Sequence, residues 1–169
     1  MLFGSLPVVR LAKVLMTAML AAFAFIVTYD NLVDYGSNYE FVKHVLSMDT
    51  TFPGNSLMDR AITNPTAWSV AYAALITGEG LTFILLTVGT VTLIRALRRP
   101  AADFNRVKAW MIAGATAGFG VWFFAFMVGG EFFAMWQSKI WNGQEAAFRF
   151  YMALIGVLIF VNQTDTDAV

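Results

Sequence analysis

Four long apolar stretches, separated by segments that hold most of the charged residues, dominate the pattern of hydrophobic and polar positions along the chain. They cover roughly residues 9–30, 67–97, 108–134 and 146–162. A helix of about 20 predominantly apolar residues crosses a hydrocarbon core roughly 30 Å thick, and a helix satisfies its own backbone hydrogen bonds in that medium. The pattern therefore predicts an all-α protein, a polytopic membrane four-helix bundle that occupies residues 1–169 as one domain.

The longest connection, about residues 31–65, is too long for a simple hairpin and contains a pattern of its own. Its apolar positions share one face of a helix: Phe41, Val42, Val45 and Leu46. This spacing predicts a short amphipathic helix in the first outer segment, which we expect to lie in the plane of the membrane interface.

Composition supports a membrane protein and narrows its chemistry. Apolar residues make up 59% of the chain, above the roughly 45–50% of a soluble domain. The net charge is zero, which gives nucleic-acid binding no electrostatic support. There is no cysteine, so thiolate catalysis and cysteine-ligated metals are excluded. The single histidine, His44, has only Glu40 on its helix face and no further ligand or catalytic partner in the pattern.

Phosphate-binding loops, nucleophile elbows and zinc-protease motifs are missing from the sequence. We therefore expect a protein that is not an enzyme and that has no catalytic residues, cofactor or metal. The expected partners are the lipid bilayer and other membrane subunits or a second copy of the chain.

Basic residues predict the orientation. Seven of the eleven lie at the start of the first stretch or in and around the connection between the second and the third: Arg10, Lys13, Arg95, Arg98, Arg99, Arg106 and Lys108. Lysine and arginine in short loops face the cytoplasm. Both termini are therefore expected on the cytoplasmic side, with residues 31–65 facing outward.

Glu79 is the most costly residue of the apolar stretches. It lies about eleven residues beyond Trp68, hence roughly 16 Å deeper, where a charged side chain costs about 2.5–3.5 kcal/mol on insertion scales. Polar side chains follow on the same part of the helix surface: Tyr72, Thr82 and Thr90. Two roles remain open. Glu79 either forms a proton, cation or ligand site with this stripe, or it is a neutral acid whose hydrogen bonds hold two helices together.

A second acidic residue, Glu131, is predicted near the outer boundary of the third stretch. Arg149, in the first turn of the fourth stretch, should reach a similar depth. We predict an ion pair between Glu131 and Arg149 that clamps these two helices. Lys139 and Glu145 are alternative partners.

Small residues and aromatic residues mark contact surfaces. Gly114 and Gly118 have the spacing that lets two helices approach closely, either within the bundle or between chains. The aromatic run at residues 122–126 goes around most of its helix. Some of these rings must face lipid or another protein.

Several segments together resemble an uncharacterised family of predicted small integral membrane proteins of bacteria. The resemblance is carried by residues 38–52 (NYEFVKHVLSMDTTF), 64–68 (NPTAW), 78–80 (GEG) and 129–136 (GGEFFAMW). It covers nearly the whole chain and implies a four-span protein of a bacterial cytoplasmic (inner) membrane. It implies no activity and assigns no functional residue.

Three functions are compatible with these features. The first is an accessory or assembly subunit of a larger inner-membrane complex, which the small size and the absence of catalytic motifs favour. The alternative is a proton-coupled carrier or channel for small solutes that uses Glu79, as an oligomer. A third is a sensor whose acidic outer segment binds a cation.

Overall fold

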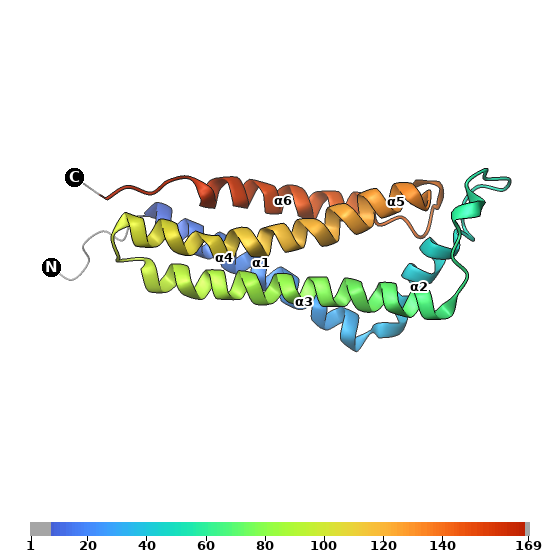
Figure 1. The fold of residues 1–169 in the computed structure, drawn as a ribbon, viewed down its shortest axis with the longest axis horizontal. Helices are drawn as coiled ribbons and strands as arrows, with labels where there is room; N and C mark the ends of the chain where they lie inside the picture. Colours follow the sequence, from blue (N-terminus) through green and yellow to red (C-terminus); the bar gives the residue numbers. More distant parts are fainter. Residues whose placement is uncertain (1–7, 168–169) are drawn as a thin grey trace.

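The computed structural model describes residues 8–167 as an elongated bundle of nearly parallel helix axes (Figure 1). Its elements are α1 (Val8–Val33), α2 (Tyr35–Ser47), the 3₁₀ turn η1 (Met58–Arg60), α3 (Pro65–Ala96), α4 (Ala101–Phe119), the π-helical η2 (Gly120–Val128), α5 (Gly129–Phe132), the 3₁₀ turn η3 (Met135–Gln137) and α6 (Gln144–Asn162). The segments α4, η2 and α5 follow one another without a break and act as a single long helix.

Four helices are long and apolar enough to cross a membrane: Val8–Val33, Pro65–Ala96, Ala101–Phe132 and Gln144–Asn162. The predicted all-α class with four membrane-length helices is confirmed. Successive spans run in opposite directions, so α1 begins and α6 ends at one end of the bundle, which we name the terminal end (Figure 1). The opposite end, named the loop end, carries α2, residues 48–64 and the connection from α5 to α6.

The helices begin and end at recognisable signals. Asn64 caps α3, because its side-chain oxygen accepts hydrogen bonds from the backbone N–H groups of Thr66, at 2.8 Å, and Ala67, at 3.4 Å. Pro65 occupies the first position of the helix, where its missing N–H costs nothing. Pro100 stands between α3 and α4, so the third membrane helix begins at Ala101, earlier than the predicted start near residue 108.

The core of the bundle consists of three apolar layers along its axis. The layer at the terminal end contains Val14, Leu93, Ala96 and Phe104. The middle layer draws on all four spans: Leu20, Ala21, Leu86, Met111, Ala115, Leu154, Val157 and Val161. The layer nearest the loop end contains Ala24, Val121, Trp122, Ala147 and Tyr151. Helix α3 packs between α1 and α4, and α6 closes the ring by touching α4 and α1.

Glycine allows α3 and α4 to approach closely. A Cβ at Gly114 would lie 2.9 Å from the backbone nitrogen of Leu86, and one at Gly118 would lie 3.0 Å from the side chain of Thr82. The small-residue spacing therefore serves a contact within the bundle, which decides between the two alternatives that the sequence left open for these glycines.

The π-helical segment η2 interrupts the third span over Gly120–Val128. A π-helix bonds residue i to i+5 and is rare; when it occurs it is often found at functional sites. Hydropathy did not predict it, because a π turn and an α turn have the same apolar composition.

Helix α2 lies at the loop end and packs against α3 (Figure 1). Its Val42 is buried, whereas the other apolar residues of its predicted face are only half-buried. The predicted helix is thus present within residues 31–65, and its position in the membrane interface and on the outer side stays a prediction. His44, on the same helix, stacks on Trp141 with ring centroids 4.7 Å apart and bonds Asp49 at 2.8 Å through Nδ1.

Candidate functional site

Glu79 is the centre of a polar group formed inside the bundle. It lies about 21 Å along α3 from Pro65 and about 26 Å from Ala96, at 1.5 Å per residue, and its side chain is 3% exposed. Because α1 continues to Val33, past the predicted end near residue 30, it brings Asn31 to the same level. Asn31 and Tyr72 are also buried.

The three side chains form a continuous hydrogen-bonded chain between α1 and α3. The Nδ2 amide of Asn31 donates to Oε2 of Glu79 at 2.6 Å. The hydroxyl of Tyr72 donates to the backbone oxygen of Asn31 at 3.0 Å and lies 3.2 Å from its Oδ1. Each of the three side chains thereby makes at least one hydrogen bond, as buried polar groups generally do.

A cavity of about 250 Å³ opens beside this chain. Its polar lining consists of Asp30, Asn31, Asn38, Tyr72 and Glu79. Asp30 and Asn38 are exposed, whereas the other three are buried, so the cavity has a polar rim and a polar floor. Its remaining walls are apolar or aromatic.

Glu79 has no cationic partner within residues 8–167, since the ion pairs of that part of the chain do not include it. The carboxyl group therefore relies on one amide hydrogen bond and on the cavity. Chemically, such a group can accept a proton or bind a donor or cation that enters the cavity.

The predicted polar stripe is only partly assembled at this site. Tyr72 joins Glu79 through Asn31, but Thr82 and Thr90 bond their own helix, to the backbone oxygens of Gly78 and Leu86, both at 2.8 Å. Neither threonine lines the cavity. Asn31 was missed because the first span was expected to end one residue before it.

The predicted pairing of Glu131 with Arg149 is replaced by local contacts. Arg149 pairs with Glu145, one helical turn earlier on α6, and both side chains are more than 70% exposed. Glu131 accepts from the side-chain amide of Gln144 at 3.5 Å. Residues four apart on one helix face each other, so the pair of Arg149 with Glu145 does not depend on how the helices pack. Glu145 was one of the alternative partners predicted from the sequence.

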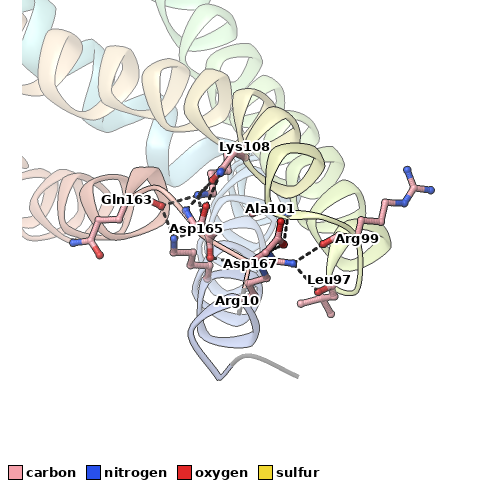
Figure 2. Close-up of polar contacts among 10 residues, drawn as sticks. Arg10, Leu97, Arg99, Ala101, Lys108, Gln163, Asp165 and Asp167 are labelled. Carbon is pink, nitrogen blue, oxygen red and sulfur yellow. Dashed lines mark hydrogen bonds and ion pairs between the residues drawn. The ribbon is translucent and has the colours of Figure 1, made fainter. Parts of the chain in front are cut away.

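A second polar cluster, which sequence reasoning missed, lies at the terminal end (Figure 2). The Nζ of Lys13 lies 2.7 Å from Oδ2 of Asp165, and the Nζ of Lys108 bonds the same oxygen. Both lysines also donate to the backbone oxygen of Gln163, at 2.6 and 2.7 Å. All three charged side chains are at most 6% exposed.

Arg10 extends this cluster to the connection between α3 and α4. It bonds the backbone oxygen of Arg99 at 2.7 Å and lies 3.8 Å from Asp165 and 3.7 Å from Asp167. Asp167 accepts from the backbone N–H of Ala101 at 2.8 Å. The segment after α6 is thus fastened to α1 and α4, so the basic residues that indicate orientation also have a structural role.

Two effects act on the pKa of Asp165 in opposite directions, namely its burial and its hydrogen bonds with Lys108 and Lys13. Burial alone would raise the pKa of the carboxyl group. Hydrogen bonds from Lys108 and Lys13 outweigh this effect and hold the pKa of Asp165 below its ordinary value. The carboxylate is therefore ionised at neutral pH and acts as the shared anion of the cluster.

Comparison with known families confirms the resemblance seen in the sequence. The sequence model of a family described as predicted small integral membrane protein (DUF2165) matches residues 9–164. The chain belongs to this family. The DUF2165 match extends from the first membrane helix to the segment that follows α6, and so includes Glu79, Asn31 and both lysines of the terminal cluster. No curated protein and no solved structure matches the chain.

Proposed function

We propose that this integral membrane protein is a proton-coupled carrier or channel for a small solute, with Glu79 as the group that exchanges a proton for the solute. The observation that carries the proposal is a buried carboxyl group, with no cation beside it in the described chain, on the floor of a cavity with a polar rim. A buried carboxyl that serves structure alone does not need an adjoining cavity.

Proton coupling follows from the cost of charge at this depth. An ionised Glu79 facing an empty cavity is unfavourable, whereas a bound cation or donor compensates that charge. Binding of the solute and release of the proton then favour each other, which is the linkage that an exchanger needs.

The test is flux across a reconstituted membrane. The purified protein is placed in liposomes with an imposed pH gradient, and small cationic, anionic and neutral solutes are added in turn while an internal dye reports pH. At least one solute should dissipate the gradient in the wild type and not in Glu79→Gln, which keeps the side-chain shape and loses the exchangeable proton.

Thr90→Val is the matched control, because Thr90 is a polar residue of the same helix that bonds only its own backbone. It should retain the flux. The proposal is wrong if no solute of the panel produces a flux that depends on Glu79.

The second candidate is the accessory subunit of a larger membrane complex. It is supported by large aromatic side chains that project from α6 and η2, since Phe124 is 67% exposed and Phe148 is 47% exposed. Purification from native membranes in mild detergent should then recover a stoichiometric partner, and Phe124→Ala should reduce its yield. Recovery of the chain alone would count against this role.

A further inference from the structure

The cavity beside Glu79 adjoins a larger groove of different chemistry. The groove has a volume of about 500 Å³ and lies between α2, α3 and the segment η2 with its flanks. Every residue that lines it is apolar. Cavity and groove share four lining residues: Phe41, Val42, Leu75 and Phe126. A polar hollow and an apolar hollow therefore border each other at these four residues.

The cavity beside Glu79, which is the polar half of this pair of hollows, suits a positive charge. It contains two carboxyl groups, Asp30 at the rim and Glu79 at the floor, and none of the described residues that line it is a lysine, arginine or histidine. The last turn of α1, which ends at Val33, lies beside it, and the C-terminal end of a helix carries partial negative charge. An anionic head group would meet repulsion from every charged element of this lining.

Aromatic rings complete the polar half. Four line the cavity together with the carboxyl groups: Phe41, Tyr72, Trp122 and Phe126. Aromatic faces attract cations through the ring quadrupole, and clusters of them recognise quaternary ammonium groups. A cavity that combines carboxyl groups with aromatic rings is a more specific candidate for binding an ammonium group than a cavity with only one of these features.

We propose that the Glu79 cavity and the adjoining groove together bind a lipophilic cation, an ammonium compound with an apolar tail. The ammonium group lies between Glu79 and the aromatic walls, and the tail lies in the groove. The inference rests on the proposed function in taking Glu79 as the binding group, and it names the substrate class of that site.

The π-helical segment η2 connects the two halves. It contributes Trp122 to the cavity and Phe124 to the groove, while Phe126 lines both. Gly120, at its start, also lines the groove, and a Cβ there would meet no atom within 4 Å. Gly120 is therefore a position at the groove where a side chain can be added without disturbing the bundle.

The experiment measures binding of octyltrimethylammonium to the purified protein in nanodiscs, with protein-free nanodiscs as the baseline. Octanesulfonate has the same tail with a negative head, and tetramethylammonium has the same head without the tail. We expect octyltrimethylammonium to bind at least tenfold more tightly than either compound. Glu79→Gln should weaken its binding at least tenfold.

Two glycine variants separate the groove from the cavity. Gly120→Leu should weaken octyltrimethylammonium binding several-fold and leave tetramethylammonium binding unchanged. Gly156→Leu is the matched control, because Gly156 lies on α6 outside the groove and a Cβ there also meets no atom within 4 Å. It should bind both compounds like the wild type.

The inference is overturned if octanesulfonate binds as tightly as octyltrimethylammonium, or if Glu79→Gln binds the cation unchanged. Its failure differs from failure of the proposed function. Cation binding that depends on Glu79 but produces no flux in liposomes supports the site and refutes transport. A Glu79-dependent flux of a neutral or anionic solute, without binding of the cation, supports transport and refutes the cation site.

Discussion

At the scale of single residues, the most demanding placement is that of Lys13 and Lys108, which are 1% and 3% exposed. A buried ammonium group is tolerated only when it is paired and hydrogen-bonded. Asp165 supplies the charge for both, and the backbone oxygen of Gln163 accepts from both. Both buried lysines therefore depend on one carboxylate.

The first prediction follows from that dependence. Asp165→Asn leaves Lys13 and Lys108 buried without their anion, and removing one partner of a buried ion pair costs about 3 kcal/mol or more. The free energy of unfolding in mixed detergent micelles should fall by about that amount. Glu145→Gln is the control, because it removes the exposed pair with Arg149, and a change beyond about 0.5 kcal/mol is not expected there.

The pH dependence of stability gives the second prediction. Because the pKa of Asp165 is lower in the folded protein than in the unfolded chain, its contribution is present above the unfolded value of about 3.9 and is lost as pH falls through the folded value. Unfolding measured from pH 6 downward should show this loss in the wild type and not in Asp165→Asn. Parallel curves for the two proteins would contradict the role of the carboxylate.

Glu79 and Asn31 show what sequence can and cannot provide at this scale. The cost of a carboxyl group in an apolar stretch was enough to single out Glu79. Asn31 lies 48 positions earlier in the sequence. A hydropathy pattern does not show which residues of two different helices lie at the same height along the bundle axis. The same limit applies to Lys13 and Asp165, which are 152 positions apart.

At the scale of elements, the contact between α3 and α4 depends on glycine. The third prediction concerns Gly114, where a Cβ would lie 2.8 Å from Cγ of Leu86 and 2.9 Å from its backbone nitrogen. Gly114→Ala should destabilise the protein by about 1–3 kcal/mol through overpacking, measured as the shift in the unfolding midpoint. Gly156→Ala, where the space is open, should be neutral or slightly stabilising.

Membrane-length helices were predictable because burial in lipid requires uninterrupted apolar length. Their interruptions were not. The π-helical segment η2 arises from a change in hydrogen-bond register, which composition does not record. The interfacial position of α2 likewise depends on the surrounding bilayer, so the amphipathic pattern predicts the helix and leaves its depth to experiment.

At the scale of the whole molecule, the even number of antiparallel spans places the start of α1 and the end of α6 at the same end (Figure 1). The fourth prediction concerns which side of the membrane that end faces. Because the chain has no cysteine, single cysteines report topology directly. Ser56→Cys, in the exposed loop end, should react with an impermeant maleimide added to right-side-out vesicles.

Ala102→Cys, exposed at the opposite end, should react only after the vesicles are permeabilised. The reverse pattern would refute the orientation predicted from lysine and arginine. Labelling of both cysteines in intact vesicles would mean a mixed orientation, which would also refute it.

The shared carboxylate at the terminal end has a consequence for the order of biosynthesis. Lys13 and Lys108 are synthesised long before Asp165, their carboxylate partner in the described chain. While the ribosome is still translating α6, Asp165 has not been made, so we expect both ammonium groups to stay hydrated. The terminal end should then close only after translation of the segment beyond α6, and a nascent chain arrested before Asp165 should expose both lysines to amine-reactive reagents.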